Sequence, residues 1–387
     1  MSKRFKYINC RDNQKYIIFD FVTMKRRVKI LYTIPNFDTA GSGKVVYDLV
    51  QGIDRGLFEP EICVFHTRGE YFKEVEKLNV PIHVFNFTTS LKPYASLFYR
   101  IYNISRFFKK HKFDIIHSWH WSSDFTEPLA AKLAGIPWLY TKKAMGWGNK
   151  SWKIRSYLST KIIAINQDMM DEFFATMLKK TIKLPLGLNT DYYQPSKKNA
   201  LLVEELNISP TDFVIVSVVN MVPVKGIEIL IKAVNEINNP SLKLLIVGNI
   251  ENDYAKGLIK ENSNKNILFL GKKIDVRPYL SLADLFVIPT KNEGKREGMP
   301  VAPLEAMAMG VPVIGSNVSG VKDILEDYPD MLFEASDIEF LKQKINDFMN
   351  NTNHFDKTKM VRNIQQKYGL QNFIKSRESI YTSIVNR

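Results

Sequence analysis

The chain has 387 residues, of which 45% are hydrophobic and 24% are charged, and its formal net charge is +14. A chain of this length exceeds one ordinary hydrophobic core, so we expect two globular domains. No apolar run approaches the roughly 18–20 residues that a transmembrane helix requires, which argues against a membrane-spanning protein. Cys10 and Cys63 show neither a disulfide framework nor metal-site spacing, which favours a reducing compartment.

The N-terminus lacks the apolar core and the small-residue cleavage site of a signal peptide. The segment that starts at Met24 itself resembles a natural protein start, so we expect residues 1–23 to be a dispensable extension. Together with the cysteine usage, these features predict a cytoplasmic protein.

A glycine-rich turn, TAGSGKVVYDLV at residues 39–50, follows the first predicted strand and leads into a predicted helix. A phosphate-binding P-loop is disfavoured because Asp38 stands where its first glycine belongs and Val45 replaces its magnesium-binding hydroxyl. The backbone N–H groups of such a turn can still receive an anion or a polar ligand. A turn that uses its glycines only for close packing explains the pattern equally well.

Short runs rich in β-branched and aromatic residues alternate with helix-like stretches along the whole chain. In the first half, the predicted strands are residues 28–34, 61–66, 82–87, 114–119, 138–141 and 161–166. After a polar, turn-rich linker, the second half has predicted strands at residues 213–219, 242–248, 266–271, 284–289 and 311–316. This alternation predicts an α/β protein with two Rossmann-like, doubly wound parallel-sheet domains that face each other across a cleft.

The linker, residues 186–200, divides the chain into a first domain at 24–190 and a second domain at 191–365. Residues 366–387 are predicted to form a C-terminal helix that packs back toward the first domain. In open parallel sheets, ligands bind beyond the carboxyl ends of the strands. We therefore expect the functional site in the cleft between the two domains.

Nearly all of the excess positive charge lies in the first 200 residues, including two acid-free stretches at 92–112 and 142–161. The first stretch has helical periodicity, with apolar residues on one side and basic residues toward the other. Such a helix suits an anionic membrane surface or an acidic partner, and it equally suits a surface helix packed on its own domain. No nucleic-acid-binding motif is present, so we expect no nucleic-acid partner. The expected membrane-facing residues are Arg100, Arg106, Lys109 and Lys110.

The most informative stretch is EGMPVAPLEAMAMG, residues 297–310, which follows a predicted strand. Glu297 and Glu305 stand on either side of a Gly-x-Pro turn and a helix start. Backbone N–H groups at a helix start suit a diphosphate, and a carboxylate can accept hydrogen bonds from vicinal sugar hydroxyls. A capping carboxylate and a solvent-facing helical glutamate would explain an isolated pair as well.

The segment from Pro289 to Leu325 resembles the donor-site signature of the family-4 retaining glycosyltransferases (glycosyl transferase group 1), which have the GT-B fold. The signature comprises the E-x7-E element, the sequence A-M-A-x-G-x-P-V-I and a glycine-containing loop at Ser319–Gly320. The resemblance extends to VVNMVPVKG, IVG and LADLFVIPT in the second half, and to the glycine turn and FDIIHSW in the first half.

The resemblance implies roles for the matching residues. Glu297 would bind sugar hydroxyls near the anomeric centre, Glu305 would hold the nucleotide ribose, and Lys225 would contact the donor diphosphate. Asn220 replaces the arginine that usually accompanies this lysine, which weakens the expected phosphate clamp, and Lys295 and Arg296 are candidates for the second charge. The other implied donor-binding residues are Gly41, Ser42, Gly43, Gly298, Met299, Pro300 and Val301.

The resemblance also implies transfer with retention on one face of the sugar, with the leaving phosphate accepting the proton of the acceptor. His117 and His120, near the end of a predicted strand, suit a catalytic role on the acceptor side, although packed histidines are as common at such positions. The chain contains no Asp-x-Asp sequence, so we expect no metal and no other cofactor.

We therefore predict a glycosyltransferase that moves a sugar from a UDP- or GDP-sugar to a lipid-linked or glycan acceptor. It would be a cytoplasmic protein, peripheral at the inner membrane face, and would act in capsule, exopolysaccharide or lipopolysaccharide biosynthesis. One alternative is a non-catalytic sugar-nucleotide-binding protein, which Asn220 favours. The other is a sugar-nucleotide epimerase or a phosphorylase of the same fold, which the two glutamates of E-x7-E disfavour.

Overall fold

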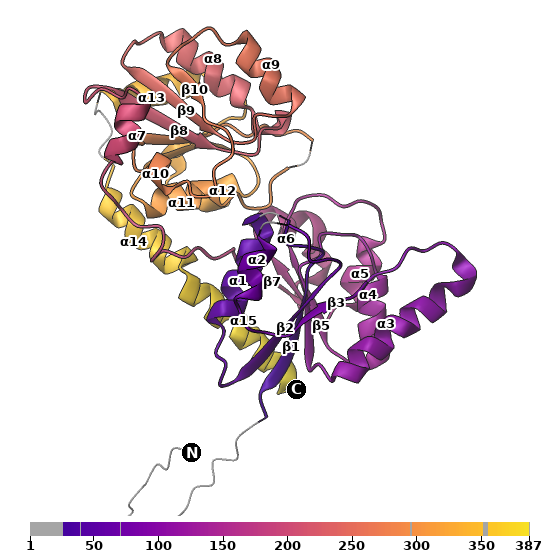
Figure 1. Cartoon of the computed structure of the whole chain (residues 1–387). Coiled ribbons are helices and arrows are strands. Elements are labelled where there is room, and N and C mark those ends of the chain that lie inside the picture. The colour runs from indigo at the N-terminus through magenta and orange to yellow at the C-terminus, as the bar shows by residue number, and fades with distance from the viewer. Residues whose placement is uncertain (1–25, 39, 70, 295, 351–354, 387) are drawn as a thin grey trace, which may run out of the picture.

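The computed structural model describes residues 26–38, 40–69, 71–294, 296–350 and 355–386. Figure 1 shows two lobes, each built on a β-sheet with helices packed around it, and two C-terminal helices that run along both lobes. The extension predicted at residues 1–23 lies outside the described residues.

The first sheet has seven parallel strands in the order β3-β2-β1-β4-β5-β6-β7. Every residue of β4 and β5 is buried, as expected of parallel strands that helices cover on both faces. The strands are β1 (Val28–Thr33), β2 (Phe58–Val64), β3 (Ile82–Val84), β4 (Ile115–Ser118), β5 (Trp138–Lys142), β6 (Lys161–Ala164) and β7 (Thr181–Lys183). The α-helices are α1 (Ala40–Gly52), α2 (Phe72–Glu76), α3 (Leu97–His111), α4 (Thr126–Ala134), α5 (Trp152–Leu158) and α6 (Gln167–Phe173).

The second sheet has six parallel strands in the order β10-β9-β8-β11-β12-β13. The direction of strand order reverses between β8 and β11, which is where doubly wound sheets bind ligands. The strands are β8 (Phe213–Val218), β9 (Leu242–Val247), β10 (Ile267–Phe269), β11 (Leu285–Ile288), β12 (Val313–Ser316) and β13 (Leu332–Phe333). The α-helices are α7 (Ala200–Glu205), α8 (Ile227–Ile237), α9 (Asp253–Glu261), α10 (Arg277–Leu280), α11 (Ala302–Ala308), α12 (Val321–Ile324) and α13 (Ile338–Met349).

The two doubly wound sheets confirm the predicted GT-B architecture, and every predicted strand is present. The sequence analysis missed β7 and β13, which are three and two residues long and lie at the edges of the sheets. Strands of this length are too short to show periodicity, and they are recognised only by their pairing with a neighbouring strand.

Helix α3 has the predicted apolar side, since Ile101, Ile104 and Phe108 are buried against the first domain. Arg100, one of the predicted membrane-facing residues, is partly exposed. Its guanidinium donates hydrogen bonds to backbone carbonyl groups of the preceding turn, at distances of 3.0–3.2 Å; the acceptors are Ser90, Lys92 and Pro93. Arg100 therefore holds the turn before α3 in place.

The C-terminal helices connect the two domains (Figure 1). Helix α14 (Lys357–Tyr368) contacts α11 in the second domain, and α15 (Leu370–Val385) packs against α1 in the first. The hydroxyl of Tyr381, on α15, forms a 2.7 Å hydrogen bond with His117 Nδ1 at the carboxyl end of β4. The other ring nitrogen, Nε2, lies 2.9 Å from Thr141 Oγ1. The last helix therefore completes the core of the first domain.

We predict that Tyr381→Phe lowers the melting temperature of the protein and leaves nucleotide affinity unchanged. The substitution removes a partner of a buried imidazole nitrogen, and an unsatisfied buried polar group typically costs about 1–3 kcal/mol. Thermal unfolding followed by circular dichroism measures the effect. The matched control is Tyr94→Phe, which removes a hydroxyl from a side chain that is 67% exposed. Equal melting temperatures of the two variants would contradict this role for Tyr381.

Candidate active site

The two domains meet at one edge of the cleft, where α6 faces the loop before α11. Asn166 Nδ2 donates a 2.5 Å hydrogen bond to the carbonyl oxygen of Gly298. The N–H group of Gln167 donates to Asp323 Oδ1 at 2.8 Å. The same edge also contains the hydrogen bond from Ser319 to Asp168 (2.5 Å) and the ion pairs Lys322–Asp168 (2.8 Å) and Arg296–Glu172 (2.7 Å). These polar contacts fix the loop before α11 and the start of α12 against the first domain.

Gly298 permits the close approach of the two domains. A Cβ atom at this position would overlap the carbonyl oxygen of Lys143, which directly follows β5. Gly320 has a φ of +78°, and a Cβ atom there would overlap the carbonyl oxygen of Gly298. Glycine is required at both positions because any side chain would push the loops apart. The packing brings Glu297 to the carboxyl edge of the first sheet.

Glu297 forms an ion pair with Lys225 in the cleft. The two side chains are 20% and 14% exposed, so a ligand can reach both. Burial lowers the pKa of the Lys225 ammonium to about 8. The turn that carries the lysine continues through Gly226, whose φ of +64° and lack of a side chain let it pack against the carbonyl of Pro289, after β11.

Glu305 lies in the first turn of α11 and faces the first domain. Burial raises the pKa of its carboxyl group, while a hydrogen bond from Tyr193 and the positive charge of Lys44 oppose this effect. Lys44 belongs to α1, where it also pairs with Asp48 at 2.9 Å. The first turns of α1 and of α11 therefore approach each other across the cleft.

The predicted glycine turn is helical in the structure. Gly41, Ser42 and Gly43 lie within the first turn of α1, which begins at Ala40, and not in a loop ahead of the helix. Gly43 is buried, and Phe37 packs close to its Cα atom. The third position of the turn therefore serves close packing, and the three residues lie inside the first turn of the helix.

Two buried backbone N–H groups lie beside Glu297. Gly298 and Met299 are both buried, and within the described part of the chain their N–H groups donate to no protein acceptor. Pro300 follows without an N–H group, and Val301 is the N-cap residue of α11. Buried N–H groups in folded proteins are nearly always hydrogen-bonded. These two N–H groups therefore indicate that a bound ligand accepts hydrogen bonds here.

Asn220 is exposed at the end of β8, and its neutral side chain supplies no second positive charge beside Lys225. Arg296, one candidate for that charge, instead forms a two-point ion pair with Glu172 of α6, with one contact at 2.7 Å. Lys295, the other candidate, lies outside the described residues. In the described part of the cleft, Lys225 is therefore the cation beside Glu297.

The two predicted catalytic histidines differ in position. His117 is fully buried, with both ring nitrogens hydrogen-bonded, and burial lowers its pKa well below the usual value. It contacts no open part of the cleft, so its predicted catalytic role is replaced by a structural one. His120 lines a cavity beyond β4, and burial, followed by the charges of Arg155 and Lys143, lowers its pKa to about 3.

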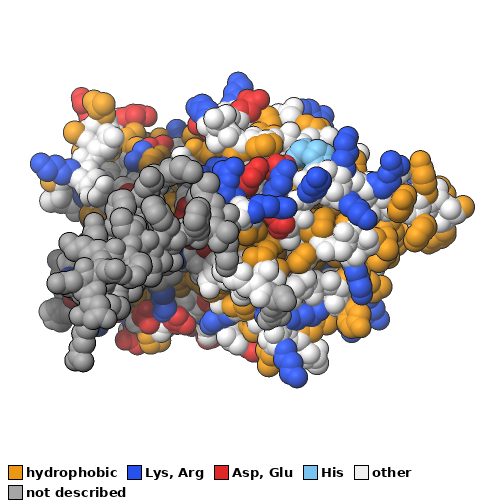
Figure 2. All heavy atoms as spheres, turned by 90° about the horizontal axis from the view of Figure 1, so that it is seen from below, with side chains coloured by type: hydrophobic (Ala, Val, Ile, Leu, Met, Phe, Trp, Pro, Cys, Tyr) orange, Lys and Arg blue, Asp and Glu red, His pale blue; other side chains and the backbone are white. Residues whose placement is uncertain are grey.

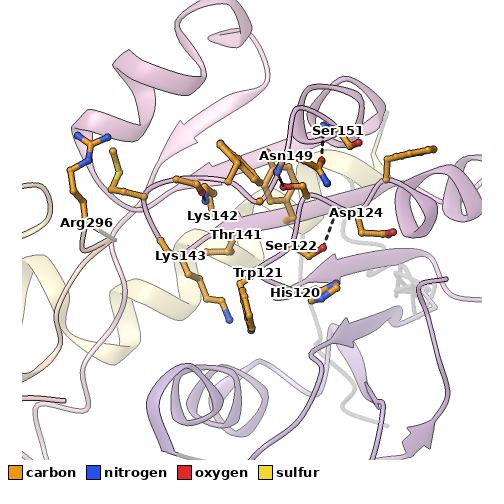
Figure 3. Close-up of a pocket in the computed structure, with 18 of the residues that line it drawn as sticks. His120, Trp121, Ser122, Asp124, Thr141, Lys142, Lys143, Asn149, Ser151 and Arg296 are labelled. Carbon is orange, nitrogen blue, oxygen red and sulfur yellow. Dashed lines mark hydrogen bonds between the residues drawn. The ribbon is translucent and has the colours of Figure 1, made fainter. Parts of the chain in front are cut away.

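The cavity at the carboxyl ends of β4 and β5 has a volume of about 760 Å³ (Figure 3). Most of its wall comes from the first domain, and Arg296 contributes from the second domain. Lys142 donates to the carbonyl of Gly146 at 2.6 Å and lies over the ring of Trp147, 3.7 Å from its centroid. The residues labelled in Figure 3 are His120, Trp121, Ser122, Asp124, Thr141, Lys142, Lys143, Asn149, Ser151 and Arg296.

A buried arginine supports one wall of this cavity. Arg155, on α5, is fully buried and pairs with the equally buried Glu127 at 3.7 Å. Its guanidinium donates to the carbonyl oxygens of Asp124, at 2.8 Å, and His120, at 3.2 Å. The sequence analysis identified only the acid-free stretch that contains Arg155. No periodicity distinguishes an arginine that is buried with a partner from one on the surface.

A group of possible metal ligands lies elsewhere in the first domain. Glu61, His83 and His111 offer ligand atoms within 4.8 Å of one another. Glu61 already forms a hydrogen bond with His83, at 2.6 Å, and an ion pair with the ammonium of Lys29, at 2.7 Å. The positive charge of Lys29 opposes a cation at this position, so the cluster is explained as a hydrogen-bonded ion-pair network.

Two family models match consecutive parts of the chain and together cover most of it. Residues 39–191 match the model described as Glycosyltransferase Family 4. Residues 200–368 match the model described as Glycosyl transferases group 1. The gap between the two matches lies in the linker between the domains.

Curated relatives include bacterial glycosyltransferases. The chain is 28% identical over 263 residues to an Escherichia coli UDP-Gal:alpha-D-GlcNAc-diphosphoundecaprenol alpha-1,3-galactosyltransferase; the match covers 61% of this chain and 66% of that enzyme. It is 25% identical over 333 residues to the Campylobacter jejuni N,N'-diacetylbacillosaminyl-diphospho-undecaprenol alpha-1,3-N-acetylgalactosaminyltransferase, covering 79% of this chain and 86% of the relative.

Solved structures share the fold over most of the chain. A Rickettsia africae glycosyltransferase has a TM-score of 0.81 with 19% identity, covering 93% of this chain and 99% of its own. Anabaena HepE, solved with UDP and glucose, has a TM-score of 0.76 with 19% identity, covering 92% of this chain and 100% of its own. The fold, the E-x7-E loop in its cleft and the two family matches agree, and the chain belongs to the family-4, group 1 glycosyltransferases with the GT-B fold.

Proposed function

We propose that the protein transfers a sugar, with retention of configuration, from a nucleoside diphosphate sugar to a lipid-linked acceptor. The supporting observation is the grouping of Glu297, Lys225 and the unpaired N–H groups of Gly298 and Met299 at one point of the cleft. The carboxylate can accept hydrogen bonds from sugar hydroxyls, and the cation and the two buried donors suit a diphosphate.

Donor binding requires Lys225 to exchange the Glu297 carboxylate for a phosphate oxygen. The buried ammonium keeps a negative partner throughout this exchange, which avoids the penalty of an unpaired buried charge. Glu297 becomes free to accept hydrogen bonds from the sugar hydroxyls. The N–H groups of Gly298 and Met299 gain acceptors and stabilise the negative charge that grows on the leaving diphosphate.

Glu305 is positioned to hold the ribose. Its carboxyl group is buried beside Tyr193, and burial raises its pKa. A ribose that donates two hydroxyl hydrogen bonds to this carboxylate would replace the water lost by burial. Lys44 of α1, whose charge reaches Glu305, places the first domain beside the same part of the donor.

His120 is the histidine that remains on the acceptor side. Its pKa of about 3 makes it neutral near pH 7 and too weak a base to remove a proton efficiently. A neutral imidazole still offers one donor and one acceptor to a substrate hydroxyl. We therefore propose that the leaving phosphate accepts the proton of the acceptor, on the same face of the sugar, which leads to retention.

The tip that precedes α3 and the first turns of α3 are proposed to contact the membrane that carries the acceptor. Figure 2 shows hydrophobic side chains gathered on a projection at one end of the molecule. The exposed aromatic residues of this tip, next to the short helix η1 (Tyr94–Ser96), are Tyr94, Phe98, Tyr99 and Tyr102, which are 67%, 71%, 66% and 48% exposed. Basic residues follow along the exposed side of the helix at Arg106, Lys109 and Lys110.

Peripheral membrane proteins commonly combine aromatic side chains at the membrane–water interface with lysines beside anionic lipid head groups. Among the described residues, no helix is both long enough and apolar enough to cross a membrane. The relatives in Escherichia coli and Campylobacter jejuni are named for diphosphoundecaprenol-linked acceptors. These observations support an acceptor in capsule, exopolysaccharide or lipopolysaccharide biosynthesis, and action at the cytoplasmic face of the membrane.

A second candidate function is the binding of sugar nucleotides without catalysis. The observation in its favour is Asn220, which is neutral and exposed where the family usually has a second cation. Release of UDP or GDP from a panel of UDP- and GDP-sugars distinguishes the candidates. Nucleotide binding without transfer and without slow donor hydrolysis would support the binding protein.

We predict that Glu297→Gln lowers transfer or donor hydrolysis by at least about 100-fold, a typical loss when a charge-stabilising group is removed from an active site. Affinity for the nucleoside diphosphate should be kept or should increase, because an amide no longer competes for Lys225. Nucleotide release and isothermal titration calorimetry measure the two effects. The control is Glu293→Gln, an exposed glutamate of the same loop. Near-normal turnover of Glu297→Gln would remove this residue from the site.

We predict that Phe98→Ser with Tyr99→Ser weakens binding to anionic vesicles at both low and high salt, because the lost contacts are apolar. Replacement of Arg106, Lys109 and Lys110 by glutamine should weaken binding mainly at low salt, at about 1 kcal/mol for each well-placed charge. Co-sedimentation with phosphatidylglycerol vesicles measures both effects.

The control for the membrane variants is Leu201→Ser, which removes a side chain that is 78% exposed on α7 of the second domain. Its binding to vesicles should match that of the unmodified protein. Unchanged co-sedimentation of both tip variants would mean that α3 is an ordinary domain surface.

A further inference from the structure

Lys143, directly after β5, has an ammonium group without a partner. Its Nζ atom is shielded from solvent and makes no hydrogen bond within the described residues. The interaction that remains is with the ring of the buried Trp119, whose centroid is 5.8 Å from Nζ. Burial lowers the pKa of this ammonium to about 7. A charged group that is removed from water without a counter-charge destabilises a folded protein.

The groups around Lys143 supply no counter-charge. His117 and His120 are neutral, and the positive charge of Lys143 is one of the causes that lower their pKa values, after burial. Asp124 is the carboxylate among the described residues that line the cavity. Its oxygens already accept hydrogen bonds from the hydroxyl group of Thr126, at 2.8 Å, and from the backbone N–H of Thr126, at 2.9 Å.

The other cations at the cavity have partners, unlike Lys143. Lys142 donates to the carbonyl of Gly146, Arg296 pairs with Glu172, and the supporting Arg155 pairs with Glu127. Arg155 and Arg296 are therefore neutralised by carboxylates and Lys142 has a hydrogen-bond acceptor, whereas Lys143 has neither within the described residues. A buried cation maintained in this state is available to an anion from outside the chain.

The cavity gives this anion an apolar surrounding. Figure 3 shows the side chain of Lys143 extending from the end of β5 toward Trp121 and His120. Trp147, Met145 and Leu91 contribute further apolar wall. Leu91 also lies at the rim, next to the turn that leads to the exposed tip of α3, and is 38% exposed. The apolar wall of the cavity therefore continues, through Leu91, toward the turn that leads to the exposed tip.

We propose that Lys143 is an anion-binding residue that takes a phosphoryl group of a substrate within this cavity. The inference rests on the proposed function and narrows its substrate class, because the acceptor would carry a phosphate beside its sugar. The diphosphate of the donor has the same chemistry and is the second source of such a group. If the phosphoryl group belongs to the donor, Lys143 would supply the second positive charge beside Lys225 that Asn220 does not provide.

The test compares Lys143→Met, Lys143→Arg and the unmodified protein. Without ligand, Lys143→Met should have an equal or higher melting temperature, because an apolar side chain replaces an unpaired buried cation. A lysine with a purely structural role would give a lower melting temperature. Lys153→Met is the matched control, since it removes an exposed lysine from α5 in the same basic stretch.

Ligand binding is measured by calorimetry with farnesyl diphosphate, farnesol, UDP and GDP. Lys143→Met should weaken binding of at least one diphosphate about tenfold or more, as the loss of a charge-assisted hydrogen bond implies. Lys143→Arg should retain most of that affinity, and farnesol binding should not change. A selective loss for farnesyl diphosphate assigns the phosphoryl group to the acceptor, and a selective loss for the nucleotide assigns it to the donor.

Unchanged affinity for all of the diphosphates would overturn this inference, as would a lower melting temperature of Lys143→Met with normal ligand binding. Neither result would affect the proposed transfer reaction, which is tested separately by donor turnover in Glu297→Gln. Conversely, if the unmodified protein bound neither UDP nor GDP, the proposed function itself would be contradicted.

Discussion

The backbone at Gly298 packs directly against the carbonyl group of Lys143, while Asn166 donates a hydrogen bond to the carbonyl of Gly298. No other residue type fits this position, because a Cβ atom would overlap the neighbouring carbonyl oxygen. The contact aligns the carboxyl edges of the two sheets, so that the Glu297–Lys225 pair of one domain lies next to the cavity of the other. The proposed transfer from donor to acceptor depends on this contact between the two backbones.

The cleft is electrostatically incomplete without a ligand. Among the described residues, Glu297 is the counter-charge of Lys225 and is assigned to the sugar by the proposed function, and Lys143 has no counter-charge. Burial lowers the pKa of both ammonium groups, to about 8 and about 7, because both lose water without a fixed hydrogen-bond network. Phosphate groups would satisfy both cations. Under the proposed function, this shared requirement would connect the donor site to the cavity, and Lys143 would supply the positive charge that Asn220 lacks.

Sequence patterns predicted the parts of the protein that depend on local periodicity and motif spacing. The alternation of strands and helices predicted both sheets, and E-x7-E located the loop that enters the cleft. Tertiary contacts decided the remainder. His117 became structural because Tyr381, far along the chain, occupies its Nδ1. Arg100 is held by the carbonyls of a nearby turn. Lys143 is identified only by the absence of a partner, which no sequence pattern reports.

The melting temperature of the protein, measured with UDP, GDP, ADP and CMP and in each case with magnesium and with EDTA, shows whether the cleft binds the nucleotide part of the donor. A ligand at 100 times its dissociation constant stabilises the folded state by roughly 2.7 kcal/mol, which is visible as a higher melting temperature. We expect one nucleoside diphosphate to raise the melting temperature equally with magnesium and with EDTA, because Lys225 and buried N–H groups would hold the diphosphate. No response to any nucleotide would contradict a donor site in this cleft.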